Sequence, residues 1–128
     1  MDRKFLEQAI DLAYQNVRNQ KGEPYGAVVV KDGKVIGTGT NDVQKTNDPT
    51  AHAEIQAVRE ACEYLQSTDL SDCDIYASSE PCPMCLATIY WTGANAIYYS
   101  YPKEPSEDVF GSAYVYKQIA LPMEERAI

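Results

Sequence analysis

The chain has 128 residues and a mass of 14.3 kDa, a size that fits one domain around a single core. Hydrophobic residues make up 45 % and charged residues 23 %, which excludes a disordered chain. The formal charge is −8, and the part that follows Arg59 holds eleven acidic but only three basic residues, which argues against a basic groove for nucleic acid.

The sequence also lacks the signals of a membrane or secreted protein. No segment is apolar over the roughly 20 residues that a membrane helix requires. The first residues, Met1-Asp2-Arg3-Lys4, lack the apolar core of a signal peptide. We therefore expect a cytoplasmic protein, and in that compartment a close cysteine pair indicates metal binding rather than a structural disulfide.

The N-terminal part of the chain predicts a helix and a hairpin. Apolar residues recur at helical spacing over residues 2–19, with charged residues between them. Two apolar runs follow over 26–30 and 34–38, and the Asp32-Gly33 pair between them is typical of a tight hairpin turn. We expect the helix to end before this hairpin, at the Gly and Pro residues that separate the two.

A polar loop over 41–49 precedes a second helix, which we expect over 51–65 with Thr50 as its N-cap. The remaining predicted elements are a strand over 74–78, a helix from the Cys82 motif to about Trp91, a strand over 96–100 and a short helix or strand over 114–119. Helix, hairpin, helix, strand, helix and strand in this order predict an α/β layer architecture with a hairpin followed by parallel crossovers. We expect residues 1–128 to form a single domain.

Two cysteines and the only histidine form the most informative pattern of the chain. Cys82 and Cys85 lie three residues apart at a predicted helix start, where Pro83 is tolerated and where the helix N-terminus favours a thiolate. Two thiolates and the imidazole of His52 are ligands that suit zinc. Three protein ligands leave a fourth position for water, which is typical of a catalytic zinc site rather than a structural one.

Glu54 lies where a carboxylate is unexpected. Helical spacing places it within the inward stripe of the second helix, which Ile55 and Val58 define, and a buried unpaired charge is costly. Taken alone, Glu54 reads as a residue that complements the helix dipole and faces solvent. Beside His52 and a cysteine pair, it is interpreted as a proton shuttle at a metal. The two side chains reach one point only if His52 stands at the very start of the helix.

A thioredoxin-like redox pair is the alternative of another class, because a Cys-x-x-Cys motif that follows a strand and opens a helix is typical of it. This interpretation, like that of a structural-metal module, leaves Glu54 without a role. Zinc content separates the classes. About one zinc per chain with ammonia release supports an enzyme, whereas metal-free protein with a reducible Cys82–Cys85 disulfide supports the redox pair.

Two segments carry a resemblance to a known family. Residues 46–54, Thr-Asn-Asp-Pro-Thr-Ala-His-Ala-Glu, and residues 80–91, Glu-Pro-Cys-Pro-Met-Cys-Leu-Ala-Thr-Ile-Tyr-Trp, resemble the cytidine deaminase superfamily, whose zinc-dependent members carry H-x-E and P-C-x-x-C. Residues 24–33 and 124–126 match as well, so the resemblance covers nearly the whole chain. Within the superfamily, the chain looks most similar to the bacterial guanine deaminases.

The resemblance implies a three-layer α/β/α sandwich of the cytidine deaminase type. It implies that His52, Cys82 and Cys85 bind zinc and that Glu54 is the catalytic proton shuttle. The activity that follows is the hydrolytic deamination of a small free nucleobase or related aminoheterocycle, with guanine converted to xanthine and ammonia as the first choice. Cytosine, a nucleoside or tRNA adenosine are the alternative substrates within the superfamily, and the acidic charge disfavours tRNA.

The substrate-binding residues come from the resemblance alone. Asn41 matches the family asparagine that hydrogen-bonds the base, and Tyr25 lies in a matching segment. The chain departs from the guanine deaminases at Ser112, where those enzymes have an aspartate, and Asp108 lies nearby out of register. It also ends at Ile128, where the family continues into a strand and a helix that close over the site.

The third predicted helix carries more apolar surface than packing on one sheet requires. Its apolar residues include Met84, Leu86, Ile89, Tyr90 and Trp91. The resemblance implies a homodimer around this helix, and large aromatic residues of this kind anchor interfaces. We expect a dimer in solution whose active site is more open to water than in the longer relatives.

Overall fold

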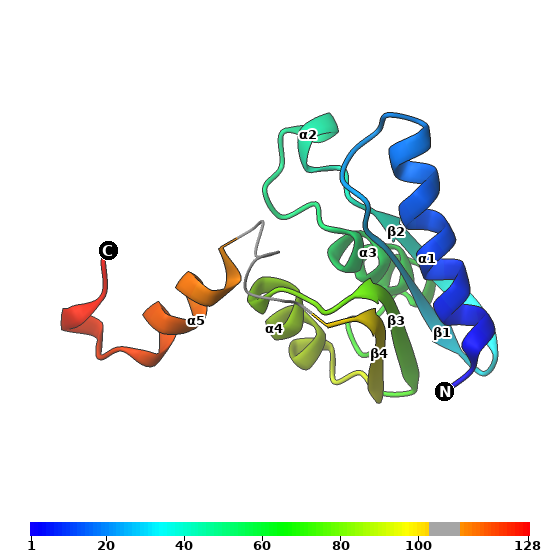
Figure 1. Ribbon diagram of the computed structural model, residues 1–128. Coiled ribbons are helices and arrows are strands. Elements are labelled where there is room, and N and C mark those ends of the chain that lie inside the picture. The colour runs from blue at the N-terminus through cyan, green and yellow to red at the C-terminus, as the bar shows by residue number, and fades with distance from the viewer. Residues whose placement is uncertain (103–110) are drawn as a thin grey trace.

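The computed structural model describes residues 1–102 and 111–128, and these form one mixed sheet with helices on both faces (Figure 1). The elements in chain order are α1 (Arg3–Arg18), β1 (Gly26–Lys31), β2 (Lys34–Thr40), α2 (Val43–Thr46), α3 (Ala53–Leu65), β3 (Cys73–Ser79), α4 (Pro83–Thr92), β4 (Ala96–Tyr101), α5 (Ser112–Ala120) and η2 (Met123–Glu125). Among the helices so described, none has the length and apolarity needed to cross a bilayer.

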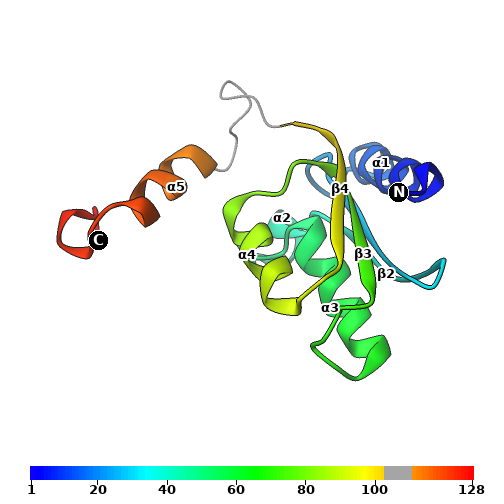
Figure 2. The same ribbon diagram turned by 90° about the horizontal axis from the view of Figure 1, so that it is seen from below.

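The sheet has the strand order β2-β1-β3-β4. β1 pairs antiparallel with both β2 and β3, and β3 pairs parallel with β4. α1 covers one face, while α3 and α4 cover the other (Figures 1 and 2). The expected three-layer α/β/α fold is therefore confirmed. The parallel crossovers are fewer than expected, because within the described sheet only the β3–β4 connection through α4 is of that kind.

The apolar run of β1 is explained by burial on both faces. Alternate residues of a strand point to opposite sides of its sheet. Val29 belongs to the core cluster under α3, whereas Val28 belongs to the cluster under α1, and both are fully buried. Gly39 of β2 lets the first turn of α3 lie against the sheet, since a Cβ there would clash with the Ala53 carbonyl oxygen. This close packing fixes the end of α3 that carries His52 and Glu54.

The hairpin is confirmed, with Gly33 at a φ of 75° in the left-handed region that its turn requires. The predicted Thr50 cap is wrong. α3 begins two residues later than expected, with His52 as its N-cap, and the Thr50 hydroxyl instead donates to the Asp48 carboxylate at 2.7 Å. The sequence left residues 114–119 open between helix and strand, and they form part of α5.

The C-terminal segment of α5 and η2 lies beside α4 and away from the sheet (Figures 1 and 2). Its apolar side chains are largely exposed, among them Tyr114 at 57 % and Ile119 at 62 %. On α4 itself, Tyr90 is 77 % and Trp91 89 % exposed, as expected for a helix whose apolar residues exceed what the sheet covers. β4 is an edge strand of the described sheet, also as expected.

Candidate active site

Two helix N-termini meet at the proposed metal ligands. His52 is the N-cap of α3, with extended backbone angles, and Cys82 is the N-cap of α4, with Pro83 in the first helical position. This is the arrangement that allows His52 and Glu54 to face one point, although they are not on one helical face. Cys85 follows one turn into α4, so both thiols lie on the side of the helix that faces α3.

The three ligand atoms are spaced as a zinc ion requires. His52 Nδ1 lies 3.5 Å from Cys82 Sγ and 3.6 Å from Cys85 Sγ, and the three ligand atoms all lie within 4.8 Å of one another. Zn–S bonds of about 2.3 Å and Zn–N bonds of about 2.0–2.1 Å at tetrahedral angles place nitrogen and sulfur about 3.6 Å apart. Within the described residues, the side chains present therefore fit a zinc ion in donor type and in spacing.

The two thiols have very different proton affinities. The thiol of Cys85 donates toward Cys82, which lowers the pKa of Cys82 to about 4 despite its burial, and His52 acts in the same direction. The backbone N–H of Cys85 also lies 3.5 Å from the Cys82 sulfur. The pKa of Cys85 is raised, because its proton is held by the Cys82 thiolate and its surroundings are buried. The lowered pKa favours the thiolate of Cys82, the form in which a cysteine binds a metal.

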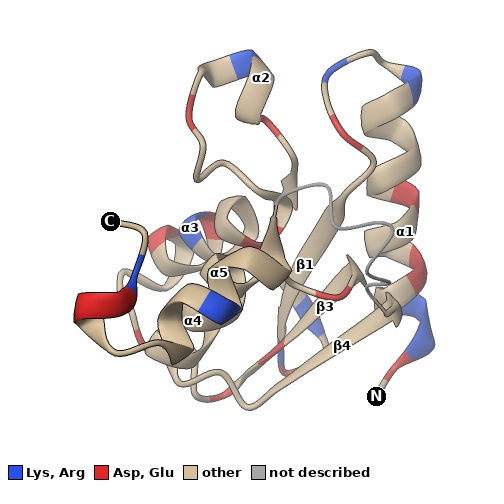
Figure 3. Ribbon diagram, turned by 60° about the vertical axis from the view of Figure 1, so that its left-hand side comes forward, with Lys and Arg blue, Asp and Glu red and all other residues tan. Residues whose placement is uncertain are grey.

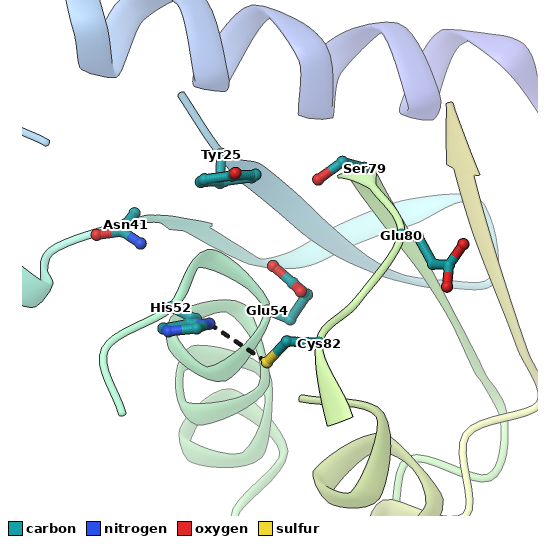
Figure 4. A pocket seen from close by; sticks show the side chains of 7 residues that line it. All are labelled: Tyr25, Asn41, His52, Glu54, Ser79, Glu80 and Cys82. Carbon is teal, nitrogen blue, oxygen red and sulfur yellow. Dashed lines mark hydrogen bonds between the residues drawn. The ribbon is translucent and has the colours of Figure 1, made fainter. Parts of the chain in front are cut away.

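Glu54 is buried in the first turn of α3, with 8 % of its surface exposed. Burial raises the pKa of its carboxyl above the ordinary value of 4.5, and the neighbouring Cys82 thiolate acts in the same direction. Figure 4 shows the carboxylate directed into a small pocket that His52 and Cys82 also line. A carboxyl with a raised pKa beside a pocket is suited to take up a proton and pass it on.

Asn41 and Tyr25 line the same pocket from the side opposite Cys82 (Figure 4). Asn41 is fully buried, and its Oδ1 accepts a hydrogen bond of 3.2 Å from the N–H of Val43. Its Nδ2 has no partner among the described residues and is turned toward the pocket (Figure 4). A buried, unpaired donor of this kind suits an acceptor atom on a bound molecule.

Ser112 lies outside this pocket but next to it. It is 4 % exposed at the start of α5, in an apolar groove that shares His52 and Cys82 with the pocket and that Val43 and Met84 also line. Asp108, the other expected residue of the C-terminal part, lies outside the described residues. The structure thus brings six of the eight expected site residues to one pocket or its metal group, and places the seventh beside it.

Sequence reasoning missed two polar residues that line the pocket, Ser79 and Glu80. Ser79 is the last residue of β3 and Glu80 follows it, and the N–H of Glu80 donates to the Tyr101 carbonyl at 2.7 Å. Their position in the sequence could have indicated this, because they connect a predicted strand to the cysteine motif and so must lie near the metal ligands. Figure 4 shows the Glu80 carboxylate directed away from Glu54, so the two acids do not share the pocket centre.

The charges of the described chain do not form a basic surface near this site. Lys and Arg residues are spread over α1, α2, α3, α5 and the strands, with Asp and Glu between them (Figure 3). A nucleic-acid groove requires several cations gathered along one path. This distribution agrees with the expectation, drawn from the charge of −8, that the substrate is small.

Comparison with known proteins agrees with this geometry. The family model of the cytidine and deoxycytidylate deaminase zinc-binding region matches residues 1–101. The chain is 47 % identical over 125 residues to guanine deaminase of Bacillus subtilis, an overlap that covers 97 % of this chain and 80 % of that enzyme. The crystal structure of that enzyme is similar, with a TM-score of 0.93 and 46 % identity over 100 % of this chain and 83 % of the other.

A tRNA-specific adenosine deaminase of Aquifex aeolicus is 48 % identical, but over only 67 residues, which are 52 % of this chain and 44 % of that protein. The similarity to this enzyme is thus confined to about half of the chain. The similarity to the guanine deaminase extends through the C-terminal part as well.

Proposed function

The chain belongs to the cytidine and deoxycytidylate deaminase family, and we propose that it hydrolyses guanine to xanthine and ammonia. The observation that carries the proposal is the buried Glu54 carboxylate in a pocket beside a His52, Cys82 and Cys85 group whose spacing fits zinc. The choice of guanine is supported by the identity to the Bacillus subtilis enzyme over nearly the full chain.

His52, Cys82 and Cys85 would hold the zinc ion. When bound, zinc supplies a Lewis acid that makes a water molecule acidic near neutral pH. The pKa of Cys82 is lowered, and the helix N-terminus at which both cysteines lie favours the thiolate form that binds this cation.

Glu54 would move the protons of the reaction. Its carboxylate takes a proton from the water whose oxygen bonds to the amino-bearing ring carbon, and it gives this proton to the adjacent ring nitrogen. It then takes the second proton of that water, from the hydroxyl now on the ring carbon, and passes it to the amino group. The carbon–nitrogen bond breaks and ammonia is released. One water is consumed for each base. The raised pKa of Glu54 favours its taking up a proton, which the carboxyl then passes on to the base.

Asn41 would orient the base by donating from Nδ2 to an acceptor of the ring. Tyr25, which lines the same side of the pocket, would contact the bound base. Ser112 would lie at the edge of the base, beside the apolar groove. Asp108 completes the set of residues that we assign to substrate binding. A neutral Ser112 hydroxyl is a weak partner for the two donors of guanine's amidine edge, so an acid such as Asp108 or Glu107 would answer that edge.

We further propose that residues 1–128 act as one deaminase domain, that the protein is cytoplasmic and that it forms a homodimer. All four cysteines are free thiols, which suits a reducing compartment. The exposed Tyr90 and Trp91 on α4 and the open β4 edge offer surfaces for a second copy.

Ammonia release tests the proposal directly. Guanine, cytosine, adenine, their nucleosides and pterin-like aminoheterocycles are incubated with protein of known zinc content, and the base products are identified by chromatography. We expect about one zinc per chain and the highest kcat/KM with guanine. Zinc-loaded protein that releases ammonia only from another compound would overturn the guanine assignment and keep the deaminase. Zinc-free, inactive protein with a Cys82–Cys85 disulfide would overturn both.

A further inference from the structure

A buried asparagine of α1 lies next to the base-binding side of the pocket. Asn16 is only 2 % exposed, on a helix whose other inward residues include Phe5, Ala9 and Ala13. Its Oδ1 is buried and has no hydrogen-bond partner among the described residues. Burying an amide with an unpaired atom is unfavourable, and an alanine at this position would avoid that cost. The contacts of its Nδ2 therefore have to explain why this position holds an asparagine.

The Nδ2 group of Asn16 donates to main-chain carbonyls of two different loops. It lies 2.9 Å from the carbonyl oxygen of Asn41, in a fully buried contact, and 2.9 Å from that of Glu23. Both amide hydrogens are thereby used, and because both neighbours are acceptors, the nitrogen must be the atom that faces them. The C-terminal end of α1 thus joins the loop before β1 to the loop after β2.

Each of these loops presents a residue that lines the pocket. The Glu23 carbonyl also accepts the N–H of Tyr25 at 2.8 Å, which fixes the backbone just ahead of that ring. Asn41 is held at its carbonyl by Asn16 and at its Oδ1 by the N–H of Val43. With both oxygens engaged, only Nδ2 of Asn41 is left to face the pocket (Figure 4).

Gly22 leaves the space in which this contact is made. A Cβ at Gly22 would clash with the main-chain oxygen of Asn41 and would lie 3.1 Å from Nδ2 of Asn16. The absent side chain of Gly22 and the buried amide of Asn16 thus both allow the loop before β1 to lie against the loop after β2.

We propose that Asn16 is a positioning residue for substrate binding, which holds Asn41 and Tyr25 in one arrangement so that the Asn41 amide meets the ring acceptor of the base. The proposal rests on the deaminase function proposed above. Asn16 touches neither the reacting atoms nor the metal ligands. Its loss should therefore weaken binding of the base and leave the zinc content and the proton transfers of Glu54 nearly unchanged.

The first test compares Asn16→Ala with Asn19→Ala, which removes an exposed asparagine from the end of the same helix. We expect Asn16→Ala to raise KM for guanine about tenfold, the effect of one hydrogen bond, with kcat reduced less than threefold. Zinc should stay at about one per chain. Asn19→Ala should match the wild type in all three quantities. An unchanged KM in folded, zinc-loaded Asn16→Ala protein would overturn the proposal.

A double-mutant cycle separates positioning from a general structural role. If Asn16 acts through the Asn41 side chain, Asn16→Ala should raise KM less than threefold in an Asn41→Ala background, because no amide remains to be positioned. Equal factors in both backgrounds would overturn the proposal that Asn16 positions the Asn41 amide. If Asn16→Ala does not fold, Gly22→Ala replaces it, since its Cβ separates the same loops and leaves the Asn16 amide in place.

A readout without substrate distinguishes this inference from the proposed function. The N–H of Val43 is held by Oδ1 of Asn41, so Asn16→Ala should speed its hydrogen exchange about tenfold, whereas Asn19→Ala should not. Wild-type protein without guanine turnover would contradict the proposed substrate and leave this measurement valid. Unchanged Val43 exchange in Asn16→Ala protein would overturn the positioning role whatever the substrate is.

Discussion

The metal-binding side of the pocket is held by two helix N-termini, whereas its base-binding side is held by loops. His52 and Cys82 are N-caps, so their backbones are fixed by the regular hydrogen bonds of α3 and α4. Tyr25 and Asn41 lie before β1 and after β2, and their positions depend on side-chain contacts with α1. A rigid metal side can carry one chemistry while a loop-built side adapts to different bases.

The two sides also differ in what a substitution should do. A change on the metal side removes a ligand or a proton carrier, for which no neighbour can substitute. A change on the base side moves or weakens one of several contacts, so its effect should appear mainly in KM. The following variants test this difference, and the largest effect is expected on the metal side.

Cys85→Ala should abolish both zinc binding and activity, and should lower the midpoint of thermal unfolding, because a metal that joins α3 to α4 stabilises the folded state. Cys62→Ala is the matched control, since Cys62 is a partly buried thiol away from the metal group. Metal analysis and thermal unfolding with and without chelator are the measurements. A wild-type midpoint that chelator does not change would show that the fold does not depend on the metal.

Glu54→Gln should keep zinc and fold but lose at least the roughly 10²–10⁴-fold that general acid–base catalysis contributes. The amide has nearly the same shape as the carboxyl but cannot carry protons. Steady-state ammonia release and zinc content are measured on the same preparation. The control is Glu60→Gln, which changes an exposed acid on the same helix. A rate within a few fold of the wild type would remove Glu54 from the mechanism.

The same Glu54→Gln variant should alter the pH dependence of stability in metal-free protein. Burial raises the pKa of Glu54 above 4.5, so the folded state binds this proton more tightly than the unfolded state does. The stability that Glu54 contributes is fully present below pH 4.5 and is lost as the pH rises through the folded-state pKa. Glu54→Gln should therefore be the more stable protein at neutral pH, with the difference vanishing toward pH 4. Denaturation is measured for both proteins at neutral pH and at pH 4. The same difference in stability between variant and wild type at both pH values would contradict this.

Ser112→Asp should change selectivity by about tenfold, because a carboxylate answers the amidine edge of guanine with two charge-assisted hydrogen bonds. We expect kcat/KM for guanine to rise relative to cytosine, with Ala113→Asp on the same helix as the control. Asp108→Asn and Glu107→Gln test whether one of these acids binds the amidine edge of guanine in place of Ser112. If neither reduces guanine turnover in the protein with Ser112, neither acid reads the purine edge, and a broader preference for aminoheterocycles follows.

Trp91→Ala should have the smallest effect on the rate, since Trp91 is 89 % exposed on the far side of α4 from the pocket ligands. Its effect should appear in association, because exposed aromatic residues anchor interfaces. Light scattering at micromolar concentration should show a dimer for the wild type and a larger monomer fraction for the variant. A 14 kDa wild-type species at every concentration would rule out the dimer.

The sequence by itself determined the chemistry of the metal side. A donor set such as that of His52, Cys82 and Cys85 is a local pattern, and its meaning depends on residue type and short spacing rather than on packing. The same holds for Glu54, whose inward position follows from helical periodicity alone. The hairpin and the main helices were predictable for the same reason, since turn residues and periodicity act over a few neighbouring positions.

Only the tertiary structure decided how the base side is built. On α1 the apolar residues Tyr14 and Val17 are 60 % and 48 % exposed, while the polar Asn16 between them is buried. Thr50 has the residue type of an N-cap, yet the N-cap of α3 is His52, and the Thr50 hydroxyl donates to Asp48 instead. Such outcomes depend on which loops meet after the sheet has formed. The contact between Asn16 and Asn41 cannot be predicted from sequence spacing, because the distance between the two residues is not fixed until the strands between them pair.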